Sequence, residues 1–158
     1  MHIRQAQQED IQDFLRLFRQ IEAQHRELLP RKYSKPEEDT LKEDFFALLN
    51  TPEEKIFFLE NEDKHIIGYI QVAVKHAGNG STLKERDYLE ISTLVIDEKE
   101  RRKGYGEQLL LAVENFAREQ NIFDIQLNVW GCNSNANAFY QKQDYLPICQ
   151  FRRKVLKY

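Results

Sequence analysis

The sequence predicts an α/β protein with a mixed central β-sheet covered by helices on both faces. Four segments carry apolar residues at helical spacing, and short apolar runs typical of strands lie between them. No internal repeat, low-complexity stretch or long linker interrupts this order. The chain has 158 residues, which fits one domain with a single substantial core. We therefore expect a single domain over residues 1–158.

The first half of the chain predicts two helices and three strands. A short strand at 3–6 precedes an amphipathic helix over 9–28, whose apolar residues recur every three or four positions. A second helix, marked by apolar positions over 41–49, ends before a turn that contains proline. Residues 56–59 and 65–75 are rich in β-branched and aromatic residues and predict the two arms of a hairpin.

The second half alternates strands and helices. A strand at 88–96 leads through a glycine-containing turn into a helix with a buried stripe over 109–117. A strand at 122–130, a short helix at 133–143 and a last strand at 151–156 follow. The complete order β-α-α-β-β-β-α-β-α-β indicates a sheet with a helical layer on each side.

Composition narrows the class of protein. The formal net charge of −3 argues against nucleic-acid binding, which usually needs a strongly basic face. No apolar run approaches the ~20 residues of a membrane span, and residues 1–5 lack the apolar core of a signal peptide. Cys132 and Cys149 are too few for a disulfide framework, and the four histidines show no metal-ligand spacing. We expect a cytoplasmic protein without a metal, and we expect Cys132 to be a small buried thiol.

The turn at residues 101–106 reads Arg-Arg-Lys-Gly-Tyr-Gly between a strand and a helix. Glycines allow close approach of the backbone, and the first N–H groups of a helix attract anions. The turn lacks the spacing of a nucleoside-triphosphate loop, and Leu109 stands where a dinucleotide-binding motif has its third glycine. An ordinary tight turn with a solvated basic run is the alternative. We expect the turn to bind a phosphate-bearing cofactor.

This turn resembles the main cofactor motif of the GNAT superfamily of acyl-CoA-dependent N-acetyltransferases, Gln/Arg-x-x-Gly-x-Gly/Ala. The resemblance implies a GNAT fold that uses acetyl-CoA as co-substrate. It also implies that the loop wraps the pyrophosphate of acetyl-CoA, and that the end of the preceding strand bonds the pantetheine arm and thioester through its backbone. The loop residues are Arg101, Arg102, Lys103, Gly104, Tyr105 and Gly106, and the strand residues are Leu94, Val95 and Ile96.

A second stretch resembles another family motif, Asn-x-x-Ala-x-x-x-Tyr-x-x-x-Gly-Phe/Tyr. The matching residues are Asn133, Ala136, Tyr140 and Tyr145. The resemblance implies that Asn133 and Ala136 lie at the pantetheine and that Tyr140 lies close to the thioester sulfur. Asp144 stands where the family usually has glycine; aspartate tolerates the left-handed conformation better than most residues, so we expect the helix end to survive.

Two side chains are candidates for proton transfer. A tyrosine hydroxyl, with an ordinary pKa of about 10, stays protonated at neutral pH, so Tyr140 could protonate the leaving thiolate. A packing tyrosine is the alternative. Glu90 is the candidate base, acting directly or through water; along a regular strand it shares a face with Ser92 and Leu94. A solvent-facing or salt-bridged glutamate is the alternative.

The function that the resemblance implies is acetyl transfer from acetyl-CoA to a primary amine of an unidentified small molecule, by direct attack in a ternary complex. Two alternatives stay open: a protein lysine or N-terminal acetyltransferase, and a catalytically weak acyl-CoA-binding regulatory module. We expect acceptor specificity from the first two helices and the segments 31–35 and 77–86. A homodimer is a further expectation, because many relatives are dimers.

Overall fold

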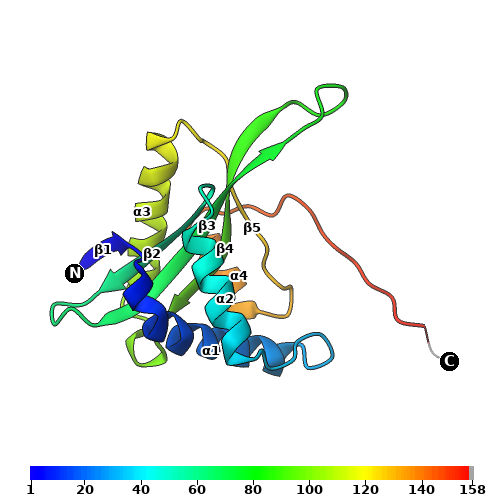
Figure 1. The fold of residues 1–158 in the computed structure, drawn as a ribbon. Helices are drawn as coiled ribbons and strands as arrows, with labels where there is room; N and C mark the ends of the chain where they lie inside the picture. The colour runs from blue at the N-terminus through cyan, green and yellow to red at the C-terminus, as the bar shows by residue number, and fades with distance from the viewer. Residues whose placement is uncertain (157–158) are drawn as a thin grey trace. The chain divides into compact units, whose positions relative to one another are not determined.

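The computed structural model describes residues 1–156, which form five strands and four α-helices (Figure 1). The elements are β1 His2–Gln5, α1 Ile11–Leu28, α2 Glu38–Leu49, β2 Glu54–Glu60, β3 Ile66–Ala77, β4 Arg86–Ile96, α3 Tyr105–Glu119, β5 Ile125–Leu127 and α4 Ser134–Lys142. The internal contacts of the chain form two compact units, Met1–Asn128 and the segment that begins at Val129. A single domain over residues 1–158 stays a prediction.

The first unit is built on one mixed sheet with the strand order β1-β2-β3-β4-β5. The pairs β1–β2, β2–β3 and β3–β4 are antiparallel, whereas β5 runs parallel to β4. The predicted α/β class and mixed sheet are therefore confirmed.

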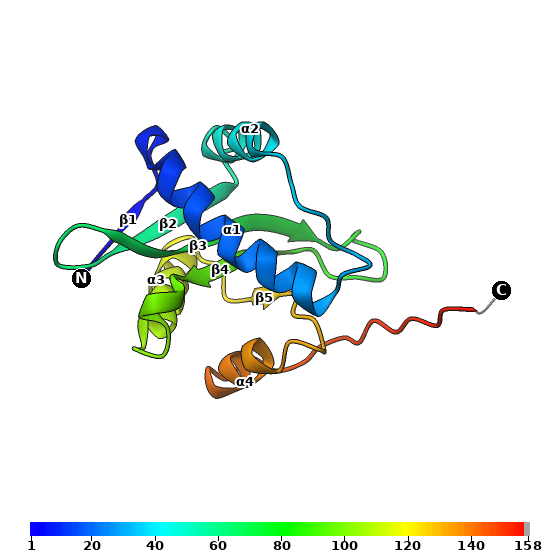
Figure 2. The same ribbon diagram turned by 90° about the horizontal axis from the view of Figure 1, so that it is seen from below.

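Helices cover both faces of this sheet in the first unit (Figure 2). On one face, the ring of Phe14 in α1 lies 5.3 Å from that of Tyr69, and the ring of Phe58 lies 5.7 Å from the same tyrosine. The neighbouring residue Phe57 instead contacts Phe116 of α3, with 5.4 Å between ring centroids. Because successive side chains of a strand point to opposite faces, α3 covers the face opposite to α1.

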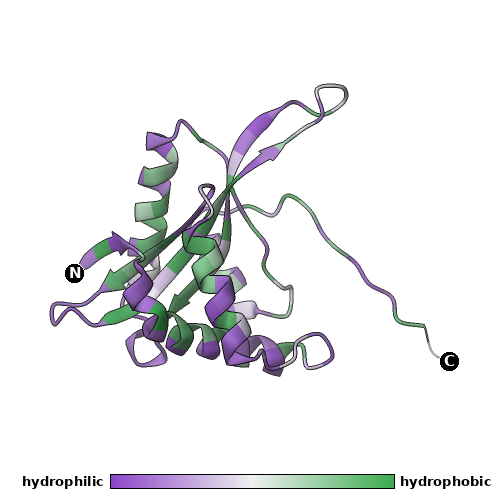
Figure 3. Cartoon of the chain, in the orientation of Figure 1, coloured by the Kyte–Doolittle hydropathy of each residue, from purple (hydrophilic) through white to green (hydrophobic). Residues whose placement is uncertain are grey.

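The core lies between these layers. The strands between the helices are largely apolar, while the turn between β2 and β3 is hydrophilic (Figure 3). Phe45 and Leu17 are fully buried against the face that α1 and α2 cover, and Leu109 and Val113 are fully buried on α3. Tyr69 is also fully buried, and its Oη atom has no hydrogen-bond partner among the described residues.

Strand β4 contains a bulge at Ser92. In the ladder between β3 and β4, Gln71 pairs with Thr93, but the next residue, Val72, pairs with Ile91. Ser92 is therefore an extra residue on β4, which is the definition of a β-bulge.

The bulge corrects one prediction about β4. Glu90 does not share a face with Ser92 and Leu94, because one inserted residue reverses the alternation beyond it. Glu90 instead shares its face with Thr93 and Val95, and Val95 is buried in the core cluster beside α1 and α2. The side chain of Glu90 thus belongs to the face that α1 and α2 cover.

The second unit contains α4. A side-chain cap marks the start of this helix, and a residue in the left-handed conformation marks its end. The Oδ1 atom of Asn133 accepts a hydrogen bond of 3.2 Å from the backbone N–H of Ala136 and so caps the helix start. At the other end Asp144 has φ 61°, and the N–H of Tyr145 donates to the carbonyl of Tyr140 at 3.0 Å. The left-handed conformation expected for Asp144 is confirmed.

Two predicted strands need correction. Residues 151–156 form no strand, because no other described strand pairs with their backbone, and they are exposed. Strand β5 is shorter than 122–130: Ile122 closes the end of α3 through a bond to the carbonyl of Ala117 (2.8 Å), and the carbonyl of Trp130 accepts from the N–H of Asn133 (2.9 Å). Cys132 is exposed, so its expected burial is also wrong.

Candidate functional site

The loop between β4 and α3 is shaped by two residues in the left-handed region. Arg102 has φ 64° and Gly104 has φ 82°. A Cβ atom added at Gly104 would meet no atom within 4 Å, so the backbone conformation, rather than crowding, favours glycine there. The loop residues 101–104 are exposed.

Helix α3 begins directly after this loop. Gly104 is its N-cap residue and, being glycine, has no side chain that could cap the helix. The first N–H groups of an α-helix have no partner within the helix, and the helix dipole adds a partial positive charge. The start of α3 therefore has a geometry that can attract an anion, and its binding of a phosphate stays a prediction.

Two side chains of this loop form hydrogen bonds with residues that lie shortly before them in the chain. The Nε atom of Arg101 donates to the carbonyl of Ile96 at 3.1 Å. The ammonium group of Lys103 lies 2.9 Å from a carboxylate oxygen of Glu100, and this hydrogen bond raises the pKa of Lys103. Two of the three consecutive cations thus hold the loop in its conformation.

The last residues of β4 have no paired strand on the side where β5 lies, and this is called here the open end of β4. Strand β5 pairs with residues 89–91 of β4 and with no others in the described chain. Leu94, Val95 and Ile96 pair with β3 on their other side. Since Arg101 bonds to Ile96, this open strand end and the glycine loop form one continuous structure.

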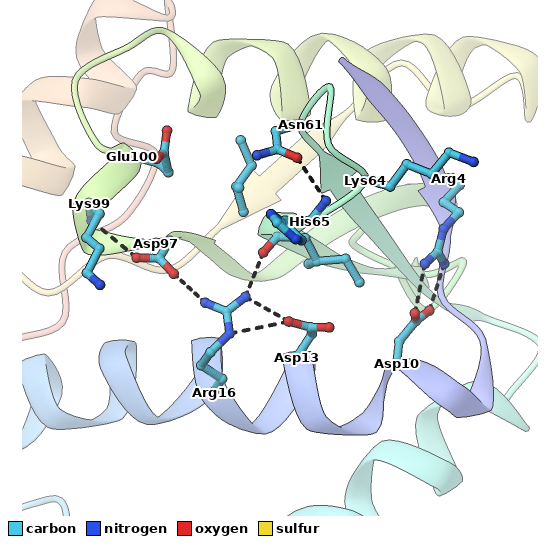
Figure 4. A pocket seen from close by; sticks show the side chains of 12 residues that line it. Arg4, Asp10, Asp13, Arg16, Asn61, Lys64, His65, Asp97, Lys99 and Glu100 are labelled. Atoms are coloured by element: carbon cyan, nitrogen blue, oxygen red, sulfur yellow. Dashed lines mark hydrogen bonds and ion pairs between the residues drawn. The ribbon is translucent and has the colours of Figure 1, made fainter.

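A pocket of about 480 Å³, lined with charged residues, lies beside α1 and the residues that lead into this loop (Figure 4). Bonds between its lining residues connect the loop to α1. Arg16 of α1 forms an ion pair with Asp97, the residue that follows β4, and donates to the carbonyl of Ile66 at 2.6 Å. Asp97 in turn accepts a hydrogen bond from the N–H of Lys99 at 3.2 Å. No sequence pattern points to Arg16 or Asp97, because their pairing joins residues 81 positions apart.

Paired charges from β1 and from the residue before α1 also line this pocket. Arg4 donates to both carboxylate oxygens of Asp10, at 2.7 and 2.8 Å, and to Glu60 at 2.6 Å. Burial acts to raise the pKa of Asp10, but the hydrogen bonds from Arg4 and from the N–H of Gln7 outweigh it and lower that pKa. These ion pairs join β1 to Asp10, the residue before α1, and to β2.

Glu90 lies in a row of residues that crosses four strands on one face. It pairs with Ala73 of β3 and with Gln126 of β5, and Ala73 pairs with Glu54 of β2. Paired residues of neighbouring strands point to the same face. The small side chain of Ala73 therefore separates two glutamates, both half-buried.

A second pocket, of about 390 Å³, adjoins one end of this row. Gln71 donates to the carboxylate of Glu54 at 3.3 Å on its floor. Its walls come from α1 and α2 and combine apolar and polar groups. The lining residues include Phe14, Phe18, Leu41, Asp44, Ala47, Leu48, Thr51, Glu54 and Gln71.

The residues of the second motif lie on or beside α4. The ring of Tyr140 lies 5.2 Å from that of Phe139 and 5.6 Å from that of Tyr145. Burial raises the pKa of Tyr140 to about 12, so its hydroxyl is protonated at neutral pH. Asn133 uses its side-chain oxygen on the N–H of Ala136.

A profile of the acetyltransferase (GNAT) family matches residues 22–145, a span that contains both motifs. The chain belongs to the GNAT acetyltransferase family. Within residues 1–156 no group of three or more His, Cys, Asp or Glu side chains could hold a metal ion. No described helix is both long and apolar enough to cross a membrane.

Solved structures match the GNAT fold of this chain over nearly its whole length. The BH1408 protein of Bacillus halodurans, solved as a tetramutant, has a TM-score of 0.94 at 22% identity, covering 99% of this chain and 100% of its own. A transcriptional regulator from Bacillus halodurans has a TM-score of 0.76 at 20% identity, covering 98% and 99%. An aminoglycoside acetyltransferase from an uncultured soil metagenomic sample, in complex with trehalose, has a TM-score of 0.67 at 20% identity, covering 98% and 96%.

Proposed function

We propose that this chain transfers an acetyl group from acetyl-CoA to a primary amine of a small-molecule acceptor. One observation carries the proposal: the open end of β4 runs through the left-handed loop into the start of α3, where the N-cap residue is glycine. Backbone N–H groups are thereby available at a strand edge and at a helix start, within one short segment. Such a segment suits a ligand with an acyl group at one end and phosphates further along.

The residues of this segment fit acetyl-CoA. The loop residues Arg101, Arg102, Lys103, Gly104, Tyr105 and Gly106 would hold the pyrophosphate, since a helix start with left-handed loop residues before it binds anions. The backbone of Leu94, Val95 and Ile96 would hold the pantetheine arm and thioester, and the family motif adds Asn133 and Ala136. When bound, acetyl-CoA supplies an acetyl group already activated as a thioester.

The chain's own groups account for the remaining steps. N–H groups at the end of β4 would stabilise negative charge on the carbonyl oxygen. Glu90, directly or through water, would accept a proton from the acceptor ammonium, which frees the nitrogen lone pair for attack. The new C–N bond forms as the C–S bond breaks, and the Tyr140 hydroxyl would protonate the departing sulfur. The second proton that the nitrogen loses on becoming an amide would return to the Tyr140 oxygen through water. This direct attack in a ternary complex needs no acyl-enzyme.

The pocket that contains Glu54, two strands from Glu90, favours a small, cationic acceptor. The pocket of about 390 Å³ is within the range of small-ligand sites, roughly 300–1,000 Å³. Its carboxylates Asp44 and Glu54 attract an ammonium group, and Phe14 and Phe18 offer apolar contact.

The test is an acceptor panel monitored by release of the CoA thiol. Polyamines, amino sugars, amino acids and arylalkylamines represent small acceptors, and peptides with free lysines or free N-termini represent proteins. We expect turnover with at least one small amine. Turnover with peptides alone would favour a protein acetyltransferase, and binding of acetyl-CoA without turnover would favour a regulatory module. An absence of acetyl-CoA binding would contradict the proposal as a whole.

The donor assignment has a separate test in Gly106→Asp, which places a carboxylate at the predicted pyrophosphate position. We expect this variant to lose its thermal stabilisation by acetyl-CoA. Gly106→Ala controls for the added carbon, and Leu111→Asp controls for a new charge on an exposed position of α3. Normal stabilisation of a folded Gly106→Asp protein would refute the assignment.

A further inference from the structure

Helix α1 uses two opposite sides over the same two turns. Phe14 and Phe18 lie four positions apart, with 5.7 Å between their ring centroids, and both line the second pocket. Arg16 and Gln20 are also four positions apart, so each pair shares one side of the helix. The second pair follows the first by two positions, which is about 200° around the helix axis. Arg16 and Gln20 therefore point away from the pocket that Phe14 and Phe18 line.

The side of α1 with Arg16 and Gln20 is bonded to the residues that lead from β4 into the glycine loop. Arg16 forms an ion pair with Asp97 and also donates to the carbonyl of Ile66 at 2.6 Å (Figure 4). One turn further along α1, the side-chain oxygen of Gln20 accepts a hydrogen bond of 2.9 Å from the N–H of Glu98. The two residues that follow the open end of β4 are thus both held by α1.

Asp97 connects this contact to the sheet and to the glycine loop. Its N–H donates to the carbonyl of Ile67 at 2.8 Å, which continues the ladder between β3 and β4 by one residue. The residue before it, Ile96, accepts the hydrogen bond from Arg101. Two arginines, Arg16 from α1 and Arg101 from the loop, therefore hold neighbouring residues of the chain. A shift of the loop is passed to α1 through direct bonds, which is the kind of network that carries coupling between sites.

The guanidinium of Arg16 is also held by its own helix. One of its terminal nitrogens donates to a carboxylate oxygen of Asp13 at 2.8 Å, while the other faces Asp97. The planar group keeps its donors in a fixed geometry, so it transmits position better than a lysine with its single flexible ammonium. The neighbouring Arg19 differs, because it forms an ion pair with Glu38 at the start of α2. Arg19 thus joins α1 to α2, whereas Arg16 joins α1 to the residues before the loop.

We propose that Arg16 and Gln20 are positioning residues that couple the glycine loop to the second pocket through α1. This coupling rests on the proposed function, because it takes the loop as the acetyl-CoA site and the pocket as the amine site. A filled loop fixes the residues to which Arg16 and Gln20 are bonded, and α1 then holds Phe14 and Phe18 in the arrangement that fits the amine. The amine binds more tightly as a result, because less ordering of its pocket remains to be done.

Nuclear magnetic resonance on the ¹⁵N-labelled full-length chain tests the coupling, with CoA as the probe and each protein compared with its own CoA-free spectrum. In the wild type, CoA should shift the backbone signals of the glycine loop and those of Phe14 and Phe18. In Arg16→Gln/Gln20→Ala the loop signals should still shift, but those of Phe14 and Phe18 should not. Arg19→Gln is the matched control and should behave as the wild type does. Unchanged shifts of Phe14 and Phe18 in the double variant, or none in a wild type whose loop responds, would overturn the coupling alone. A wild-type loop that does not respond would overturn the acetyl-CoA site, and the coupling with it.

Titration calorimetry measures the size of the coupling. In the wild type, CoA should tighten the binding of an amine from the acceptor panel about fivefold, and the amine should tighten CoA by the same factor, because linkage is reciprocal. The double variant should lose this factor while it still binds CoA. Gln20→Ala alone leaves no charge unpaired, so it decides the question if the double variant does not fold, and it should show a reduced factor. An amine affinity that is independent of CoA in the wild type, or a full factor in both variants, would overturn the proposal.

Discussion

The Nε atom of Arg101 donates a hydrogen bond of 3.1 Å to the main-chain carbonyl of Ile96, the last residue of β4. A long, charged side chain is thus used to fasten a loop to the strand before it. The first residue of the family motif thereby sets the position of the backbone that follows it. Its planar guanidinium suits this task, because its donors are held in a fixed geometry.

Replacing Arg101 should therefore weaken acetyl-CoA binding even where the charge is kept. Arg101→Gln and Arg101→Lys should both raise the Kd about tenfold, because tenfold corresponds to ~1.4 kcal/mol, near the upper end of the net contribution of a typical hydrogen bond. Isothermal titration measures this, with Arg118→Gln as the control, because Arg118 is an exposed cation in the last turn of α3. Wild-type affinity in Arg101→Lys would mean that charge, rather than the bond to Ile96, is what matters.

Gly104→Ala should destabilise the fold by about 1 kcal/mol, because the φ of 82° is unfavourable for a residue with a Cβ atom although space is open. Gly104→Asn should cost less, since asparagine tolerates this region. Urea unfolding measures both. Gly131→Ala is the control, because Gly131 also has open space but no positive φ; equal losses at the two positions would rule out this explanation.

Tyr140→Phe should lower kcat by about 10²-fold or more with a good acceptor, the usual contribution of a general acid. Because burial raises the pKa of Tyr140 to about 12, the wild-type hydroxyl should keep its proton throughout the neutral range. Steady-state kinetics on Tyr145→Phe, which removes a hydroxyl from the adjacent ring, gives the matched comparison. An unchanged kcat in Tyr140→Phe would remove it as the acid.

Glu90→Gln should remove the acidic limb of the pH–rate profile and lower kcat, because an amide cannot accept the acceptor's proton. Glu54→Gln, on the other side of Ala73, should instead raise KM for cationic acceptors with kcat nearly unchanged. Profiles of kcat and kcat/KM against pH separate these outcomes. An unaltered profile for Glu90→Gln would exclude Glu90 as the base.

Tyr69→Phe should leave the protein at least as stable at pH 7, since the buried Tyr69 hydroxyl has no partner among the described residues. Burial raises the pKa of Tyr69 in the folded state. Above pH ~10 only the unfolded state then ionises this residue, so wild-type stability should fall by up to ~1.4 kcal/mol per pH unit. The variant should show a smaller fall. Urea unfolding at pH 7 and pH 11 checks both points; a marked loss in the variant at pH 7 would mean that the hydroxyl is bonded.

Much of the fold could be predicted from local patterns. Helical periodicity predicted α1, α2 and α3, and the known tolerance of aspartate for positive φ predicted the end of α4 at Asp144. The bulge at Ser92 could not be predicted, because register depends on which residues of β3 lie opposite. The strand at 151–156 failed for a related reason: its composition suits a strand, but a strand also needs a partner.

The candidate site also contains some features that the sequence predicted and others that it could not predict. The glycine loop was found because Gly104 and its position before a helix leave a mark in the sequence. Asp97 and Arg16, which tie this loop to α1, leave none, since ion pairs between distant positions have no spacing rule. The side to which Glu90 points was predicted on the assumption of a regular strand, and the bulge changed its neighbours.

The open end of β4 is made by the main chain, and every amino acid except proline carries the same N–H group. Most substitutions at Leu94, Val95 and Ile96 therefore keep this hydrogen-bond donor, provided that the strand still forms. The amino acids at these positions can change while the shape of the strand is kept. The same fold is indeed found at 22% identity with a TM-score of 0.94.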